Sequence, residues 1–147
     1  MSKLIAIGCD HGGFELKGQI SELLTELGFE VVDCGCFSSA SVDYPDIAKT
    51  LCEKITCGEC EKGVLICGTG IGMSISANKI NGIRCAHCTD TYSAAMAAEH
   101  NNANVIALGA RITGSELAKC IVKSWLNSSF LGGRHAERVN KIMALEK

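Results

Sequence analysis

The chain has 147 residues, 47% of them hydrophobic, and a formal net charge of −2. That length suits one domain with a substantial core, and the balanced charge excludes a general attraction to nucleic acid or to anionic lipid. Because the apolar N-terminal run is too short for a signal sequence and no segment reaches membrane-spanning length, we expect a cytoplasmic protein with a single domain over residues 1–147.

Strand-like and helix-like segments alternate along the chain. Short apolar runs are typical of strands buried in a parallel sheet, and apolar residues three and four apart indicate helices. We predict strands at residues 3–8, 29–33, 62–67, 83–88 and 104–108, and helices at 14–27, 43–56, 73–80, 90–100, 114–127 and 135–145. This alternation implies right-handed crossovers and an α/β fold: a three-layer, Rossmann-like, doubly wound sheet of five parallel strands with helices on both faces.

Two of these helices carry apolar residues that we expect to face the sheet. In the first helix they are Phe14, Ile20, Leu23, Leu24 and Leu27, and Gly28 ends the helix. In the helix at 73–80 they are Met73, Ile75, Ala77 and Ile80. Ligands in such sheets bind beyond the carboxyl ends of the strands, near the point where strand order reverses. We therefore expect the polar residues after the first and third strands to share one pocket.

The segment KGVLICGTGIGM, residues 62–73, combines a buried strand, a glycine turn and a helix N-terminus. The glycines allow the backbone to approach a ligand and to direct N–H groups at it, beside the positive end of a helix dipole. The same field favours the thiolate of Cys67, which ends the strand. The segment therefore predicts an anion site along residues 68–72, next to a general base.

Each candidate residue also has a purely structural interpretation. Cys67 is either a base or a small apolar residue at a strand end, and its place at the glycine turn favours the base. Asp10 is a good helix cap, but His11 beside it adds nothing to a cap, which favours binding or catalysis. Arg134 and Arg138 lie one helical turn apart, so they either bind one phosphate together or form a solvated basic face.

The direction of the helices indicates that two subunits share each site. The helix at 90–100 runs away from the carboxyl edge, so His100 and Asn101 at its end should lie on the far side of their own sheet. The two arginines near the C-terminus follow another such helix, whereas Arg111 directly follows the fifth strand. We therefore predict a homodimer with shared sites, with a tetramer as an alternative, in which the C-terminal helix packs on a partner subunit.

Ten cysteines without a signal sequence indicate reduced thiols. Cys57 with Cys60, and Cys85 with Cys88, resemble pairs of zinc ligands. However, residues three apart in a strand point to opposite faces, and a helix C-terminus disfavours a thiolate. We therefore expect no metal and no cofactor, and we interpret most cysteines as small apolar residues of the core.

The glycine turn also invites a nucleotide-binding interpretation, because Asp90 lies at about the distance expected of a ribose-binding acid. Position 73 is Met, however, where the dinucleotide pattern requires its third glycine, and the chain leaves no room for a second substrate domain. The remaining histidines, His87 and His135, are interpreted as surface residues.

Five segments together resemble the ribose-5-phosphate isomerase B family: GCDHGG, DYPD, ICGTGIG, HNNANV and GGRHAERV. The likeness runs in order from Lys3 to about Ala144. It implies a cofactor-free aldose–ketose isomerase of the pentose phosphate pathway, which interconverts D-ribose 5-phosphate and D-ribulose 5-phosphate through an enediolate. Some relatives carry an acid in the glycine loop instead of the cysteine base, and galactose-6-phosphate isomerases lack the histidine and the GGRH segment. This chain has the cysteine, the histidine and GGRH.

The resemblance implies a role for each matching residue. Cys67 is the base that moves a proton between C1 and C2, and His100 opens the furanose ring. Asp10 with His11 holds the sugar and its phosphate end. The other matching residues form the anion hole, contact the substrate or bind its phosphate: Gly68, Thr69, Gly70, Ile71, Gly72, Asn101, Arg111, Arg134 and Arg138.

Three alternatives remain open. The first is a six-carbon aldose phosphate as substrate, such as allose 6-phosphate or galactose 6-phosphate, which needs only a slightly deeper pocket. One carbon unit changes the binding free energy of a substrate only slightly. A non-catalytic sugar-phosphate or nucleotide-binding protein would use the glycine turn and the arginines, but would not need Cys67 or His100. A zinc-stabilised redox protein would instead hold stoichiometric metal.

Overall fold

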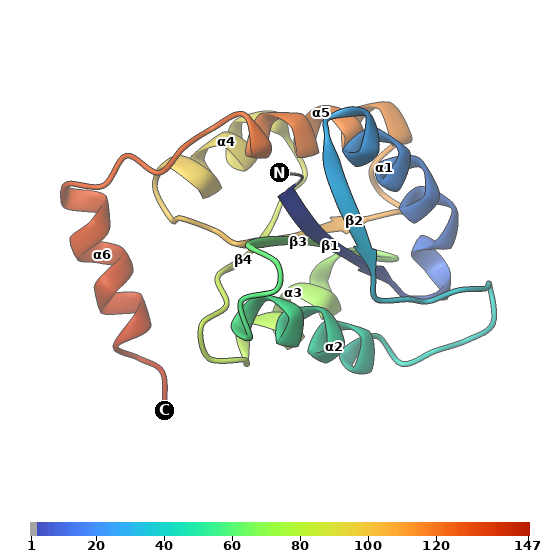
Figure 1. The fold of residues 1–147 in the computed structure, drawn as a ribbon, viewed down its shortest axis with the longest axis horizontal. Helices are drawn as coiled ribbons and strands as arrows, with labels where there is room; N and C mark the ends of the chain where they lie inside the picture. The colour runs from blue at the N-terminus through green and yellow to red at the C-terminus, as the bar shows by residue number, and fades with distance from the viewer. Residues whose placement is uncertain (1–2) are drawn as a thin grey trace.

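The computed structural model describes residues 3–147, and its core is one five-stranded sheet (Figure 1). Neighbouring strands are parallel and lie in the order β2-β1-β3-β5-β4. The first two residues of the expected domain lie outside the described range. The elements are β1 (Lys3–Cys9), the 3-10 helix η1 (His11–Gly13), α1 (Phe14–Glu26), β2 (Phe29–Asp33), α2 (Tyr44–Thr56), β3 (Lys62–Cys67), α3 (Ile71–Asn78), β4 (Cys85–His87), α4 (Thr91–Glu99), β5 (Val105–Gly109), α5 (Ser115–Leu126) and α6 (Arg134–Met143).

Helices cover both faces of the sheet. α1, α4 and α5 lie on one face, and α2 and α3 lie on the other (Figure 1). Each face has its own apolar core, which includes Ile20 and Trp125 on the first face and Leu51 and Met73 on the second. The predicted three-layer α/β fold is therefore confirmed. Within residues 3–147, no helix combines the length and apolar character needed to cross a membrane.

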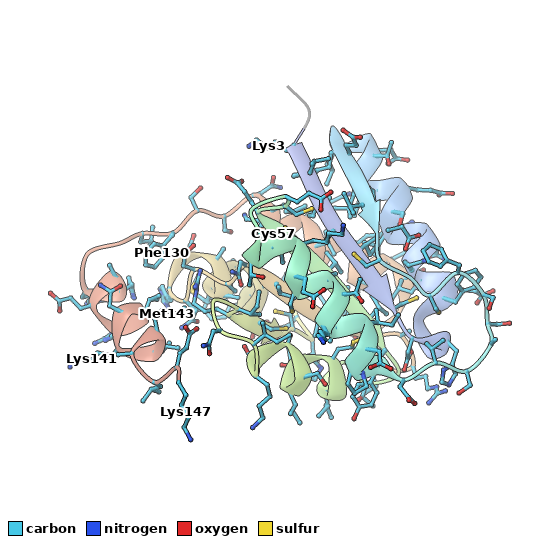
Figure 2. All side chains as sticks on the ribbon, turned by 60° about the horizontal axis from the view of Figure 1, so that its bottom comes forward. Lys3, Cys57, Phe130, Lys141, Met143 and Lys147 are labelled. Carbon is cyan, nitrogen blue, oxygen red and sulfur yellow. The ribbon has the colours of Figure 1, made fainter. Side chains whose placement is uncertain are left out.

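The last helix, α6, stands apart from these layers, beyond the β4 edge of the sheet (Figure 1). Figure 2 shows Lys141, Met143 and Lys147 on α6 and the segment after it, away from the helices that cover the sheet. Only His135 and Val139 of this helix are buried. Most of its surface is therefore left uncovered by its own chain.

The fourth strand is shorter than predicted, and several helices begin or end within a few residues of the expected positions. β4 holds only Cys85–His87 of the predicted 83–88. Just before it, the Arg84 N–H donates to the side-chain oxygen of Asn104 at 2.8 Å, which replaces a backbone partner in the sheet. A hydrogen bond to a side chain therefore replaces the strand-to-strand backbone bond that was expected at this position.

Two residues expected in the core are exposed. Leu27 is 43% exposed, because α1 ends before it and the chain turns at Gly28, whose φ is +94°. Ile75 is 58% exposed, because it follows the buried Met73 by two residues and so lies about 200° around the helix from it. Ile75 and the exposed Ile71 share the outer face of α3. That face is an apolar stripe open to solvent in the single chain.

The strand order reverses between β1 and β3. From β1 the chain passes to β2 on one side, whereas from β3 it passes to β4 and β5 on the other. The register pairs Cys9 of β1 with Ile66 of β3. Asp10 and Cys67 therefore leave the sheet side by side, at the point where sheets of this kind bind ligands.

Candidate active site

Cys67 ends β3 at this switch point and lies beneath the glycine turn. It is 4% exposed, and its Sγ accepts a hydrogen bond from the Gly70 N–H at 3.1 Å. The turn needs glycine here, because Gly70 has a φ of +83°, a left-handed conformation that side-chain-bearing residues rarely adopt. An N–H aimed at sulfur stabilises negative charge on it. The Gly70 N–H thus holds the Cys67 sulfur directly beneath the turn.

Two side chains that the sequence analysis did not assign to the site lie against the glycine turn. A Cβ placed on Gly72 would lie 2.6 Å from the Tyr44 ring, and one placed on Gly70 would lie 2.8 Å from the His87 ring. Tyr44 begins α2 and His87 ends β4. Both lie near the carboxyl edge of the sheet. The rule that ligands bind at this edge, which indicated Asp10 and Cys67, therefore also indicates these two side chains.

Asp10 and His11 follow β1 and lie beside the glycine turn. The Asp10 N–H donates to the Ile66 carbonyl at 3.1 Å, and its carboxylate accepts the Gly12 N–H at 2.9 Å. The capping interpretation of Asp10 is therefore realised. His11 Nδ1 accepts the Val42 N–H at 3.3 Å, which leaves the proton of a neutral ring on Nε2. Nε2 can then donate to a ligand.

Arg111 lies between the residues that follow β1 and those that follow β3. Its N–H donates to the Gly68 carbonyl at 2.9 Å. Its guanidinium lies along both glycine segments, since a Cβ on Gly68 would lie 3.1 Å from Nη1 and one on Gly12 would lie 3.5 Å from Nη2. The residues after β1 and β3 therefore lie next to each other, which the prediction of one shared pocket requires. Arg111 brings to this place the local cation that an anionic ligand needs.

His100 lies at the opposite edge of the sheet. β3 and β5 pair in register from Gly63 to Cys67, and four residues of strand span about 13 Å. The Gly63 N–H donates to the Asn104 carbonyl at 2.9 Å, which puts the turn after α4 at the amino edge. His100, the C-terminal cap of α4, is therefore remote from Cys67 of its own chain, as the helix direction predicted.

His100 stacks on His135, the second residue of α6. The ring centroids are 4.1 Å apart and the ring planes differ by 9°. His135 is 9% exposed, so its interpretation as a surface residue is wrong. Burial, and then the charges of His100, Arg134 and Arg138, lower the pKa of His135. The stack brings His100 to the start of α6, which also carries the two arginines.

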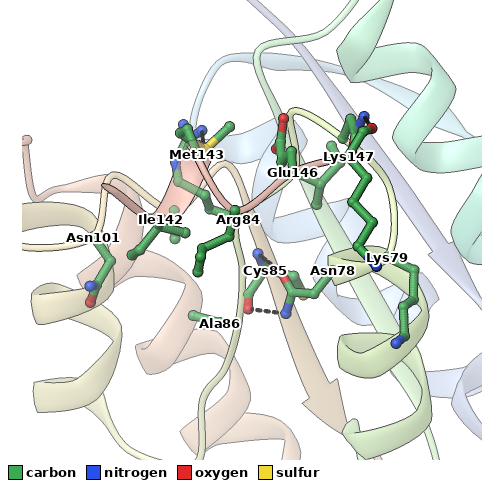
Figure 3. Close-up of a pocket in the computed structure, with 14 residues that line it drawn as sticks. Asn78, Lys79, Arg84, Cys85, Ala86, Asn101, Ile142, Met143, Glu146 and Lys147 are labelled. Atoms are coloured by element: carbon green, nitrogen blue, oxygen red, sulfur yellow. Dashed lines mark hydrogen bonds between the residues drawn. The ribbon is translucent and has the colours of Figure 1, made fainter. Parts of the chain in front are cut away.

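A cavity of about 740 Å³ lies between α6 and the β4 edge. Figure 3 shows Asn101 on one side of it, with Arg84 and Ile142 between Asn101 and the Asn78–Cys85 hydrogen bond. Among the predicted site residues, only Asn101 lines this cavity. The cavity is therefore separate from the Cys67 corner of the same chain.

The structure gives no support to the nucleotide-binding interpretation of Asp90. Its carboxylate accepts the Ser93 N–H at 2.7 Å and the Ser93 hydroxyl at 2.8 Å. These bonds lower the pKa of Asp90 and make it the cap of α4. The ten cysteines are free thiols, six of them buried, and residues 3–147 contain no group of three His, Cys, Asp or Glu side chains arranged to hold a metal ion.

The glycine turn lies at the switch point of a parallel sheet, the position where α/β proteins of this architecture bind small ligands. Residues 5–142 match the sequence pattern of the family described as Ribose/Galactose Isomerase. The chain belongs to this family and is an isomerase by that membership.

Three relatives show how close the likeness is. The ribose-5-phosphate isomerase B of Escherichia coli is 50% identical over 99% of this chain and 97% of its own length. The D-erythrulose-4-phosphate isomerase of Pectobacterium atrosepticum is also 50% identical, over 94% of this chain and 91% of its own. The solved structure of Clostridium thermocellum ribose-5-phosphate isomerase B matches with a TM-score of 0.95 and 51% identity, covering 97% of this chain and 96% of that one.

Proposed function

We propose that this chain interconverts D-ribose 5-phosphate and D-ribulose 5-phosphate in the pentose phosphate pathway of the cytoplasm, without a metal or cofactor. The observation that carries the proposal is the Cys67 thiol, buried beneath the glycine turn with the Gly70 N–H on its sulfur. Relatives of this name cover nearly the full chain at half identity. Ten free thiols suit a reducing compartment.

The chemistry is a proton transfer between two carbons. The Cys67 thiolate removes the C2 proton of the open-chain aldose, which gives an enediolate. Return of a proton to C1, with the hydroxyl proton exchanged between the two oxygens, gives the ketose. Negative charge that develops on the oxygens is stabilised by backbone donors within Gly68 to Gly72 and by the Arg111 guanidinium. Without a ligand, the Gly70 N–H donates to Cys67 Sγ and the Ile71 N–H to Thr69 Oγ1, so these two must change partner to serve the substrate. Thr69 contacts the substrate from the exposed side of the turn.

Asp10 and His11 hold the sugar and its phosphate end. Asp10 is 8% exposed, and its carboxylate is fixed by the Gly12 N–H. His11 presents Nε2–H because Val42 occupies Nδ1. A fixed donor and a fixed acceptor orient a sugar more firmly than mobile surface groups do.

We further propose a homodimer in which a partner completes each site with His100, Asn101, Arg134 and Arg138, and in which α6 packs on the partner. This explains why His100 and Asn101 lie near the edge of the sheet opposite Cys67 of their own chain, and why the two arginines lie on α6, whose start stacks on His100. The exposed apolar stripe on α3 and the uncovered surface of α6 suit such an interface. A tetramer of two such dimers is an alternative, and a fully active monomer in sedimentation would contradict both.

Three other substrates or roles deserve a direct test. A relative at half identity is named for a four-carbon sugar phosphate, and six-carbon aldose phosphates need only a deeper pocket. A sugar-phosphate or nucleotide-binding protein without catalysis would keep the anion site and have no use for Cys67. We therefore include aldose phosphates of four, five and six carbons in the assay below.

The deciding experiment compares the wild-type protein with Cys67→Ala in chelator, following conversion of ribose 5-phosphate and, in parallel, of four-carbon and six-carbon aldose phosphates. Loss of a general base lowers turnover by about 10²- to 10⁴-fold, and we expect KM to change little. Cys120→Ala, an exposed cysteine on α5, is the matched control and should retain full activity. Unchanged turnover in Cys67→Ala would remove Cys67 as the base. A wild-type protein that binds these phosphates but converts none of them would instead support the binding protein.

A further inference from the structure

The His100–His135 stack ties two segments that are distant in the sequence. His100 lies at the end of α4, where its N–H donates to the Met96 carbonyl at 2.8 Å. Nearby, the Leu131 N–H donates to the Glu99 carbonyl at 3.0 Å, which joins the segment before α6 to the end of α4. The backbone on both sides of the stack is thus held in place. The imidazole of His100 still needs a side-chain neighbour to fix its plane.

His135 is built to be that neighbour. It is 9% exposed, whereas His100 is only half-buried. Its N–H donates to the Gly132 carbonyl at 3.0 Å, at a turn where Gly132 and Gly133 both have positive φ. Nearly parallel rings 4.1 Å apart restrict rotation of the more exposed ring. The outer ring, His100, is therefore held in one plane by the inner ring.

We propose that His135 is a positioning residue that orients the His100 imidazole for opening the sugar ring in a neighbouring subunit. The inference rests on the proposed function. In this step His100 takes the proton of the C1 hydroxyl and delivers a proton to the ring oxygen. The bond between C1 and the ring oxygen breaks as the C1 carbonyl forms. Such a transfer requires the imidazole to be oriented so that a ring nitrogen points at the two oxygens. A freely rotating ring rarely adopts this orientation.

The charges around the stack agree with this role. Burial, and then the charges of His100, Arg134 and Arg138, lower the pKa of His135. A lowered pKa favours the uncharged His135 ring, which adds no positive charge beside His100.

The test compares His135→Ala with His135→Phe, which keeps a flat ring for the stack. We expect His135→Ala to lower turnover of ribose 5-phosphate by about tenfold to a hundredfold and His135→Phe to retain most of it. Ribulose 5-phosphate is open-chain, because its terminal oxygen is phosphorylated. Enzyme-catalysed exchange of its C1 proton with deuterated solvent needs the base but no ring opening, and should be unchanged in both variants.

Two further measurements keep the outcome unambiguous. The imidazole proton signal of His100, assigned with His100→Ala, should shift in His135→Ala and keep its ring-current displacement in His135→Phe. Equal loss of turnover and exchange in His135→Ala would overturn the proposal, as would full turnover in that variant or failure of His135→Phe to rescue it. If His100→Ala itself converts ribose 5-phosphate normally, the proposed ring-opening role of His100 fails, whatever His135 does.

Discussion

The proposed site has two parts that are built in opposite ways. We call them the Cys67 corner, which also contains Asp10, and the His100 corner, which also contains His135. The Cys67 corner lies at the switch point of the sheet, between buried strands, and its polar groups are largely backbone N–H groups of a glycine turn. The His100 corner lies at the other edge, where side chains from the ends of α4 and α6 stack on each other. The first corner owes its geometry to the core of its own chain. The second owes it to a few side chains and, in our proposal, to a partner.

This difference separates stability from activity. Changes at the Cys67 corner disturb packed backbone, so they should affect folding and catalysis together. A change at His100 affects a half-buried side chain at a helix end, so it should affect catalysis with little loss of stability. The predictions below test this separation.

The largest expected effect is recovery of activity from two inactive proteins. Cys67→Ala and His100→Ala each lack one corner, and mixed dimers of the two contain one site with both corners intact. After denaturation and joint refolding of equal amounts, statistical pairing should restore about a quarter of wild-type activity. Steady-state conversion of ribose 5-phosphate measures it.

The matched control mixes Cys67→Ala with Asp10→Asn, which damages the same corner. No mixed dimer of that pair contains an intact Cys67 corner joined to an intact Asp10, so no recovery is expected. If Cys67→Ala with His100→Ala also remains inactive while mixed dimers are demonstrably present, the two corners do not meet across subunits.

A smaller but clear effect is expected from Gly109→Ala, which tests the backbone-built corner. A Cβ at Gly109 would lie 2.5 Å from the Thr69 carbonyl oxygen and 2.6 Å from its carbon, and backbone atoms cannot move aside as a flexible side chain can. Overpacking of this kind lowers the free energy of unfolding by about 1–3 kcal/mol. We expect a lower melting temperature and a partial loss of turnover.

Gly114→Ala is the matched control for this variant. It lies shortly after Gly109, but no atom within 4 Å would meet its Cβ, and its φ of −63° suits alanine. Calorimetry should show only a small loss of stability, because Gly114 is the N-cap of α5, where alanine is less favourable than glycine. A Gly109→Ala protein as stable and active as Gly114→Ala would mean that the turn is more adaptable than the contacts indicate.

The sequence was sufficient to predict the Cys67 corner because its geometry follows from local rules. A strand that ends in Cys67, followed by glycines and a helix, specifies the turn, and strand alternation specifies that Asp10 lies beside it. The same topology placed His100 at the opposite edge. These inferences needed only chain direction and backbone conformation.

The sequence was insufficient wherever side chains distant in the chain meet. His135 looked like a surface residue, because nothing in the pattern of α6 indicates a stack on the end of α4. Chain direction places Tyr44 and His87 near the carboxyl edge of the sheet, but their contact with the glycine turn depends on packing between separate elements, which the sequence pattern does not specify. Ile75 was assigned to the core because spacing alone does not say which side of a short, apolar helix faces the sheet.

The smallest predicted effects are two changes in the pH dependence of stability. One concerns a thiol in the core of the chain, and the other concerns His135 in the His100 corner. Burial raises the pKa of the Cys52 thiol to about 12 from its ordinary 9.0. Above pH 9 the unfolded chain therefore releases a proton that the folded chain holds, so stability falls as the pH rises towards 12. Each such thiol contributes a slope of up to about 1.4 kcal/mol per pH unit. Cys52→Ala should flatten this alkaline decline.

His135 acts at the acid end, because its pKa is lowered from the ordinary value of 6.5 by burial and by His100, Arg134 and Arg138. As the pH falls below about 6.5, the unfolded chain binds a proton that the folded chain does not, so stability declines. His135→Phe should flatten the acid decline and leave the alkaline one unchanged, whereas Cys52→Ala should do the reverse. Urea unfolding between pH 5 and 10 measures both. An acid decline that is equally steep in His135→Phe would show that the stacked ring gains a proton as readily in the folded chain as in the unfolded one.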